Sequence, residues 1–180
     1  MKPKRIVITG GPGTGKTSII NELSSRNYSC LQEISRKVTL EAREKGIEQF
    51  FLTEPLLFSE LLLKGRKSQF DEAATITSNF VFLDRGIPDI LAYMDYSGDE
   101  YPQFFNEACK NNIYDHIFIL APWQKIYISD NERYENFNQA KKIHHQLVKI
   151  YEKFNYKLID VPFYSIKKRT DYILNILENL

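Results

Sequence analysis

The sequence predicts an α/β protein in which a five-stranded parallel β-sheet lies between two layers of α-helices. Two features of the 180 residues lead to this prediction. Short runs rich in Ile, Val, Leu and Phe alternate with longer segments whose apolar side chains recur at helical spacing. Two of the short runs, at residues 80–83 and 117–120, are apolar throughout, as is typical of parallel strands that helices cover on both faces. An alternation of this kind gives a three-layer α/β/α arrangement.

The boundaries of the strands and helices follow from these patterns and from the turn residues between them. Strands are expected at residues 5–9, 29–33, 79–84, 116–120 and 157–161. Helices are expected at residues 16–25, over most of residues 36–75, and at 88–96, 102–110, 138–154 and 165–178. Pro55 suits the first turn of the second helix within residues 36–75, with Thr53 as its N-cap, and Ser165 is placed to cap the last helix. No linker interrupts the series, so we expect residues 1–180 to form one domain.

Composition and charge narrow the classes of function. Hydrophobic residues make up 43% and charged residues 26%, and the formal net charge of +1 gives no basic field for nucleic acid or a membrane surface. No apolar run approaches the roughly 20 residues of a membrane span, and the first residues lack an apolar signal core. Cys30 and Cys109 stand in neither a metal nor a redox spacing, which indicates free thiols in a reducing compartment. We therefore expect a cytoplasmic protein without membrane or nucleic-acid partners, and the sequence leaves its oligomeric state open.

A phosphate-binding loop joins the first strand to the first helix. Residues 10–17 read Gly-Gly-Pro-Gly-Thr-Gly-Lys-Thr and match the pattern G-x-x-x-x-G-K-[ST]. The glycines let the backbone wrap tightly and point its N–H groups at phosphate oxygens, and the dipole of the following helix adds to the attraction. Lys16 can reach the β- and γ-phosphates, and the Thr17 hydroxyl can bind Mg²⁺. The motif predicts a bound nucleoside triphosphate with Mg²⁺, held by Gly11, Pro12, Gly13, Thr14, Gly15, Lys16, Thr17 and Ser18.

Two charged residues close the third strand. Asp84 ends a hydrophobic run, as does the acidic residue that supports Mg²⁺ in proteins with this loop, so we expect Thr17 and Asp84 to hold the metal. Arg85 can present a planar fork of donors to the acceptor or to a phosphate. The alternative is that Arg85 only neutralises Asp84 or Asp89.

Glu33 closes the second strand and is the candidate base. Ligands of open parallel sheets bind outside the carboxyl ends of the strands, so Glu33, Asp84 and the loop at Pro122 should cluster around the phosphate loop. A carboxylate there can accept the proton of a substrate hydroxyl or orient that hydroxyl. Arg36, one turn later, can pair with Glu33, grip the acceptor or form a solvated ion pair.

Three further segments bear on the site. Residues 36–75 form a helical insertion on the acceptor side, in which the basic run 64–67 is expected to be a solvated helix end. Residues 124–136 are expected to form a lid, from which Arg133 closes over the phosphates and neutralises transition-state charge. For Arg133, a surface ion pair is an equal alternative. Trp123 lines the mouth of the nucleotide site or packs under the lid.

The combination of these motifs resembles a small P-loop family of AAA-type ATPase domains, which is similar to the kinase domain of the NAD-biosynthesis protein NadR. The residues that carry the resemblance are Thr9–Thr17, Glu33-x-x-Arg36, Asp84-Arg85-Gly86-x-Pro88-Asp89-x-x-Ala92-Tyr93, Tyr127-x-x-Asp130-x-x-Arg133 and Val161-Pro162. Asp84-Arg85 also resembles a pair found in thymidylate and deoxynucleoside kinases. The resemblance implies a P-loop NTPase fold with the kinase-like strand order 2-3-1-4-5. Only 19 residues follow Val161, enough for one helix, which speaks against a ring motor with a separate lid domain.

From these observations we expect an ATP-dependent small-molecule kinase. It would transfer the γ-phosphoryl group to a hydroxyl of a nucleoside-like metabolite, using Lys16, Glu33, Asp84, Arg85 and Arg133. The alternative is a regulatory or switch NTPase that uses ATP or GTP and has no small-molecule acceptor. The sequence lacks the Asn-Lys-x-Asp tetrapeptide of GTP switches, which favours ATP. Arg36, Arg43 and Arg66 leave a kinase with a phosphate acceptor open as well.

Overall fold

The computed structural model describes residues 2–44, 46–47, 50–127 and 136–180. Its strands are β1 (Lys4–Gly10), β2 (Ser29–Leu31), β3 (Phe80–Asp84), β4 (His116–Leu120) and β5 (Leu158–Asp160). Its helices are α1 (Lys16–Ser25), α2 (Ser35–Glu44), α3 (Phe50–Thr53), α4 (Pro55–Ala73), α5 (Ile87–Ser97), α6 (Phe104–Asn111), the 3₁₀ helix η1 (Gln124–Ile126), α7 (Phe137–Lys153) and α8 (Ile166–Glu178).

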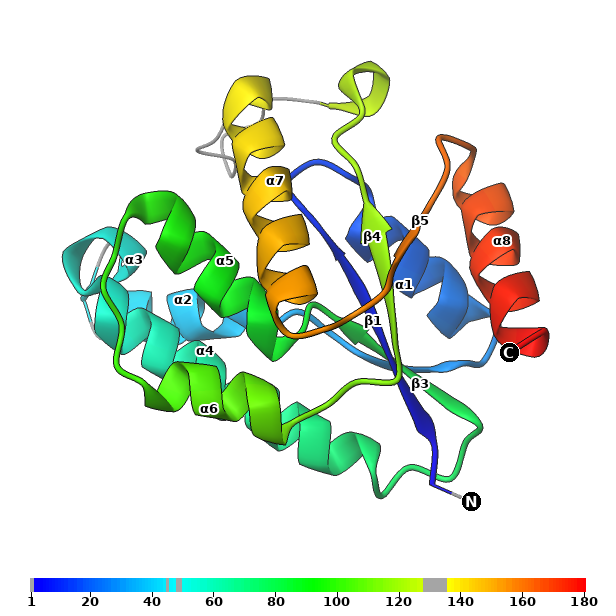
Figure 1. Ribbon diagram of the computed structural model, residues 1–180, viewed down its shortest axis with the longest axis horizontal. Helices are drawn as coiled ribbons and strands as arrows, with labels where there is room; N and C mark the ends of the chain where they lie inside the picture. Colours follow the sequence, from blue (N-terminus) through cyan, green and yellow to red (C-terminus); the bar gives the residue numbers. More distant parts are fainter. Residues whose placement is uncertain (1, 45, 48–49, 128–135) are drawn as a thin grey trace.

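The five strands form one parallel sheet in the order β2-β3-β1-β4-β5, which confirms the predicted topology. Figure 1 shows α1 and α8 on one side of this sheet and α2 to α7 on the other. The alternation of side chains along β1 explains the two layers, since Ile6 and Ile8 are buried under α1 and α8, whereas Val7 is buried under the opposite layer. All three side chains have no exposed surface, as expected for a strand that is covered on both faces.

Capping residues account for several helix boundaries. Asn136 begins α7, because its side chain accepts from the backbone N–H of Gln139 at 3.0 Å while the Gln139 side chain accepts from the Asn136 N–H. Ser165 caps α8 as predicted. Pro55 lies in the first turn of α4, as predicted, but the predicted N-cap was wrong: Glu54 occupies that position, and the Thr53 hydroxyl donates to the carbonyl of Phe50.

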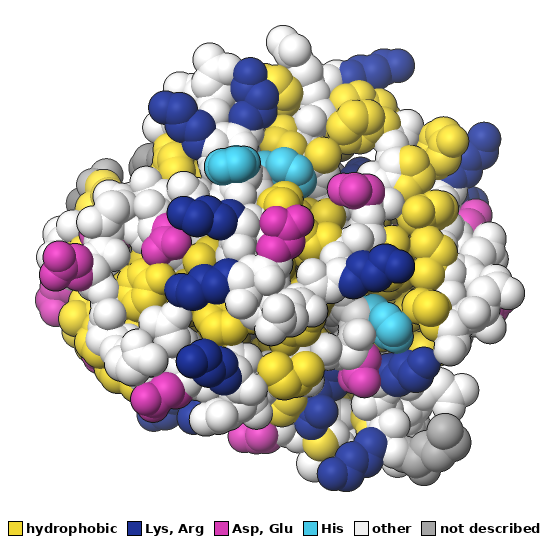
Figure 2. All heavy atoms as spheres, in the orientation of Figure 1, with side chains coloured by type: hydrophobic (Ala, Val, Ile, Leu, Met, Phe, Trp, Pro, Cys, Tyr) yellow, Lys and Arg dark blue, Asp and Glu magenta, His cyan; other side chains and the backbone are white. Residues whose placement is uncertain are grey.

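The surface carries charges of both signs. Figure 2 shows Lys and Arg side chains interspersed with Asp and Glu on the face covered by α5, α6 and α7, without a large area of one sign. Within the described residues, no helix is both long and apolar enough to cross a membrane. The described cysteines, Cys30 and Cys109, are free thiols, as predicted.

Candidate nucleotide and acceptor site

The phosphate loop lies between the carboxyl end of β1 and the amino end of α1. Gly13 and Gly15 have φ angles of 71° and 89°, which only glycine adopts without strain. A Cβ atom at Gly13 would also lie 2.7 Å from the ring of Tyr127, so this aromatic side chain packs directly on the loop. The loop therefore has both the sequence and the backbone conformation of a phosphate cradle.

Lys16 folds inward over this cradle. Its ammonium group donates to the carbonyl of Gly11 at 2.8 Å, and 7% of the residue is exposed. Burial and the neighbouring charge of Arg85 lower the pKa of Lys16 to about 7, although Asp84 and other carboxylates oppose this shift. Thr17, the next residue, is exposed at the start of α1.

Asp84 lies beside the loop as an unpartnered carboxylate. It ends β3 in register with Ile8 of β1, only 2% of it is exposed, and neither side-chain oxygen has a hydrogen-bond partner among the described residues. Burial raises the pKa of Asp84, while the charge of Lys16 opposes the rise. A buried carboxylate without donors is either protonated or neutralised by a cation, and Mg²⁺ typically takes one or two protein oxygens together with phosphate and water. The Asp84 carboxylate and the Thr17 hydroxyl fit that requirement.

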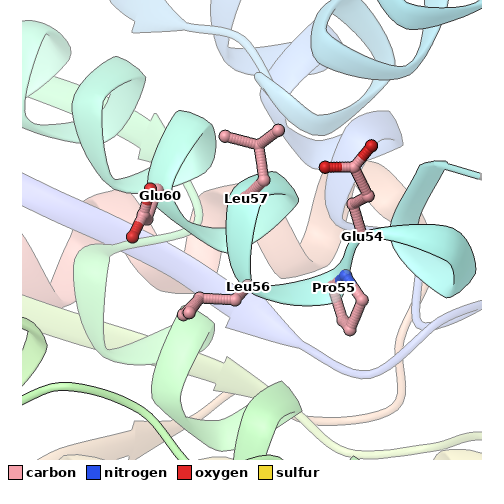
Figure 3. Close-up of a pocket in the computed structure, with 5 residues that line it drawn as sticks. All are labelled: Glu54, Pro55, Leu56, Leu57 and Glu60. Carbon is pink, nitrogen blue, oxygen red and sulfur yellow. The ribbon is translucent and has the colours of Figure 1, made fainter.

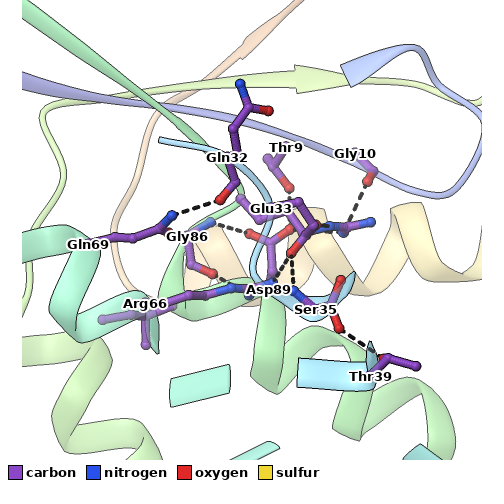
Figure 4. Close-up of polar contacts among 12 residues, drawn as sticks. Thr9, Gly10, Gln32, Glu33, Ser35, Thr39, Arg66, Gln69, Gly86 and Asp89 are labelled. Atoms are coloured by element: carbon purple, nitrogen blue, oxygen red, sulfur yellow. Dashed lines mark hydrogen bonds and ion pairs between the residues drawn. The ribbon is translucent and has the colours of Figure 1, made fainter. Parts of the chain in front are cut away.

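Glu33 lies between two arginines beside the loop, on the side where the sequence predicted the acceptor. Figure 4 shows its carboxylate among polar side chains from β1, α4 and α5. One oxygen forms an ion pair with the Nε of Arg85, and the other lies 3.3 Å from an amino group of Arg66 and 3.3 Å from the backbone N–H of Ser35. Burial raises the pKa of Glu33, but the charges of Arg85 and Arg66 outweigh this effect and bring the pKa to about 2.

Arg85 has an unusual backbone that aims its side chain into this cluster. Its φ of 75° is rare for a residue other than glycine, and such positions concentrate at functional sites. One amino group lies 3.4 Å from both the carbonyl of Gly10 and the carboxylate of Asp89. Arg85 therefore connects the carboxylates of Glu33 and Asp89 to Gly10, the first residue of the phosphate loop.

Asp89 is a fully buried hub beneath Arg85. It accepts hydrogen bonds from the Thr9 hydroxyl at 2.6 Å, the Tyr151 hydroxyl at 2.6 Å and the backbone N–H of Gly86 at 2.9 Å. Burial and the charge of Asp89 raise the pKa of Tyr151 well above its ordinary value, so this hydroxyl stays protonated and donates. The hub thus ties α5, α7 and β1 to the position of Arg85.

Sequence reasoning placed Arg66 wrongly. The run 64–67 lies within α4 and not at its end, and although Lys64 and Lys67 are exposed as expected, Arg66 is only 4% exposed. Its guanidinium donates to the carbonyl of Gly86 at 2.7 Å and to Glu33. A signal was present, because position 66 lies one turn after Leu62 and Leu63 on the buried face of the helix, where a charge needs an internal partner.

A second arginine that the sequence did not single out lies behind the phosphate loop. Both amino groups of Arg169 in α8 donate to the carbonyl of Thr14 at 3.0 Å, and the residue is 2% exposed. It shares the buried face of α8 with Ile173 and Leu177, so the same signal, a charge on an apolar stripe, was available.

Aromatic side chains gather in the segments that follow β4 and β5 and at the start of α7. Trp123, after β4, stacks on Phe163, after β5, with ring centroids 5.2 Å apart and planes 23° apart. Tyr127 meets Phe137 at the start of α7 edge to face, with centroids 5.4 Å apart. Only residues 124–127 and 136 of the expected lid are described, and Arg133 lies outside the described residues.

A shallow pocket at the start of α4 lies apart from these groups. Its lining consists of Glu54, Pro55, Leu56, Leu57 and Glu60, which point outward from the helix in Figure 3. None of these residues belongs to the phosphate loop or to the clusters around Glu33 and Asp89.

The fold and the loop define a P-loop protein of the kinase-like branch. A family model described as an AAA domain matches residues 5–169, and the chain belongs to this family. No curated protein matches the sequence significantly.

Solved structures with other sequences share the fold. Deoxyadenosine kinase from M. mycoides superposes with a TM-score of 0.74 at 16% identity, covering 98% of this chain and all of that one. Thymidylate kinase from Candida albicans gives a TM-score of 0.71 at 19% identity, covering 99% of this chain and 92% of that one. NadR protein in complex with NR gives 0.72 at 16% identity, and 98% of this chain matches half of the NadR chain.

Proposed function

We propose that this chain is an ATP-dependent kinase that transfers the γ-phosphoryl group of the nucleotide to a hydroxyl of a nucleoside-like metabolite. The observation that carries the proposal is the Glu33–Arg85 pair, which stands beside the phosphate loop and is connected to it through the carbonyl of Gly10. A carboxylate and a guanidinium beside the phosphate loop can hold the hydroxyl of a second substrate, which favours a kinase over a switch NTPase.

The charges at the acceptor side favour a hydroxyl over a phosphate as the acceptor. Arg66 and Arg85 face the carboxylates of Glu33 and Asp89, so these two positive charges are already balanced by two negative ones. A phosphate monoester would have to displace a carboxylate from an arginine, whereas a neutral hydroxyl can donate to Glu33 without disturbing the pairs.

The proposed roles follow from what each group can do. Lys16 and the loop amides hold the phosphates, and Thr17 with Asp84 would hold Mg²⁺, which neutralises charge on the transferring group when it is bound. Glu33 accepts a hydrogen bond from the acceptor hydroxyl. Because a pKa of about 2 is far below neutral pH, Glu33 orients this hydroxyl more than it removes its proton.

The base of ATP would lie towards the Trp123–Phe163 pair, since the opposite side of the loop is occupied by the Glu33 cluster. Arg133 remains our candidate for closing over the γ-phosphate. A kinase that uses ATP and has free thiols belongs in the cytoplasm.

The proteins that share this fold include a deoxyadenosine kinase and a thymidylate kinase, which supports the proposal. The decisive experiment is a screen of nucleosides and related metabolites for ADP release from Mg-ATP above the background without acceptor. Each nucleoside is paired with its monophosphate, and Lys16→Ala serves as the inactive control. We expect at least one unphosphorylated compound to stimulate release. Stimulation by monophosphates alone would refute the hydroxyl acceptor, and a flat result would favour the switch NTPase.

A further inference from the structure

Arg169 holds the phosphate loop from behind. It lies in the first turn of α8, 155 residues away from Thr14 in the sequence, and both of its amino groups donate to the Thr14 carbonyl at 3.0 Å. A Cβ atom at Gly15 would lie 3.0 Å from one of these amino groups. The guanidinium therefore packs against the backbone of the loop at two consecutive residues.

The charge of Arg169 has no counter-ion in the part of the chain that the structure describes. No described carboxylate lies within 4.0 Å of it, and its buried Nε has no hydrogen-bond partner. Burial alone lowers its pKa, with no carboxylate to oppose the shift, although an arginine stays protonated in proteins. Arg66 and Arg85 differ in this respect, because each faces a carboxylate.

A buried cation that is 2% exposed and unneutralised destabilises the folded chain unless something compensates it. The nearest feature built to hold negative charge is the loop that Arg169 contacts. We infer that Arg169 is a positioning residue of the triphosphate site: it fixes the Thr14 peptide, and its counter-ion is the polyphosphate of the bound nucleotide. This inference rests on the nucleotide binding within the proposed function and is independent of any acceptor.

The inference separates a binding role from a purely structural one. If Arg169 only supported the fold, its removal would lower the stability of the free protein. If its charge is instead neutralised by the polyphosphate, removal costs the free protein little, because the loss of an unbalanced buried charge offsets the loss of the two hydrogen bonds to the Thr14 carbonyl. The loss then appears on binding, and it is larger for ATP than for AMP, which carries fewer charges.

The test compares Arg169→Met and Arg169→Lys with wild type by calorimetry with Mg-ATP and with AMP, and by thermal unfolding without nucleotide. We expect Arg169→Met to bind Mg-ATP about tenfold more weakly, which corresponds to about 1.4 kcal/mol, because the polyphosphate loses a nearby positive charge and the Thr14 peptide is no longer fixed. Its melting temperature without nucleotide should stay within about 3 °C of wild type. Arg169→Lys, which keeps the charge, should recover part of the affinity.

A matched control is Arg26→Met, because Arg26 is likewise an arginine in contact with α8, through Asp171, but its charge is paired with Glu22 and Asp171. This variant should bind Mg-ATP like wild type. The inference is overturned if Arg169→Met binds normally, loses equal affinity for ATP and AMP, or unfolds without nucleotide, and also if Arg169→Lys recovers nothing. A wild-type protein that does not bind Mg-ATP would refute the proposed function as well, whereas binding without transfer to any acceptor would refute the proposed function alone.

Discussion

Replacing Glu33 by Gln keeps the size of the side chain and removes the negative charge that bridges Arg66 and Arg85. Both arginines then lie buried with less compensation, since they are 4% and 13% exposed. Removing one partner of a buried ion pair is strongly destabilising because the remaining charge stays desolvated. We therefore expect Glu33→Gln to lower the free energy of unfolding as well as the rate of phosphoryl transfer.

The pKa of Glu33 sets the size of this effect. Its ordinary value of 4.5 falls to about 2 in the folded protein, and its side chain is 15% exposed, so the shift represents a real interaction. At about 1.4 kcal/mol for each pKa unit, the ionised carboxylate contributes about 3 kcal/mol at neutral pH. Because the folded pKa is the lower one, this stability is complete above pH 4.5 and is lost as the pH falls towards 2. At pH 3 only about 1.4 kcal/mol remains.

Denaturant unfolding of wild type and Glu33→Gln between pH 3 and pH 7 measures this difference. Glu22→Gln is the matched control, because Glu22 also pairs with an arginine but lies on the surface of α1, where an ion pair contributes at most about 1 kcal/mol. In the proposed kinase, Glu33→Gln should also reduce phosphoryl transfer about 100-fold with little change in ATP affinity. A stability difference that is the same at pH 3 and pH 7 would contradict the assigned ion pairs. Unchanged turnover would contradict the proposed role of Glu33 towards the acceptor.

Two further predictions concern the hub and the metal. Tyr151→Phe removes one hydrogen bond to Asp89, the carboxylate that holds Arg85, and should lower kcat several-fold with little change in ATP affinity. Its control is Tyr156→Phe, which removes a hydroxyl that accepts from the backbone N–H of Tyr114 and should reduce stability alone. If the two variants have the same kcat, the proposed role of Asp89 in positioning Arg85 is wrong. Asp84→Asn should raise the Mg²⁺ concentration that half-saturates ATP-dependent thermal stabilisation at least tenfold and should leave the free protein as stable as wild type or more so, since the carboxylate lacks donors. An unchanged magnesium requirement would remove Asp84 from the metal site.

The sequence predicted the elements of the fold well because a buried sheet leaves a strong periodic pattern. All five strands and the long helices lie where hydrophobic spacing placed them, and α1 and β4 agree to the residue. The errors lie at the ends of strands, whose positions depend on pairing with a neighbouring strand. The second strand was expected to reach Glu33 but ends at Leu31, where it pairs with Leu83 near the end of β3. Glu33 is consequently in the following loop, free to turn towards Arg85.

Motifs predicted the loop and the residues at strand ends, because chain connectivity and parallel pairing bring those positions together. Motifs could not predict which partners long side chains select across the fold. The pairs Glu33 with Arg66 and Thr14 with Arg169 join residues 33 and 155 positions apart, and each depends on how a helix packs on the sheet. The role of Arg133 stays a prediction.

The distribution of charge suggests that the two halves of the site recognise their ligands by different forces. On the acceptor side, Arg66 and Arg85 are balanced by carboxylates, so a ligand gains little from carrying charge and is selected by shape and hydrogen bonds. On the nucleotide side, Arg169 has no described carboxylate within 4.0 Å, so we expect the ligand to neutralise its positive charge. Each triphosphate that binds relieves this imbalance, whereas a nucleoside offers nothing to it. The site can therefore separate an anionic donor from a neutral acceptor of related structure by charge before either base is recognised.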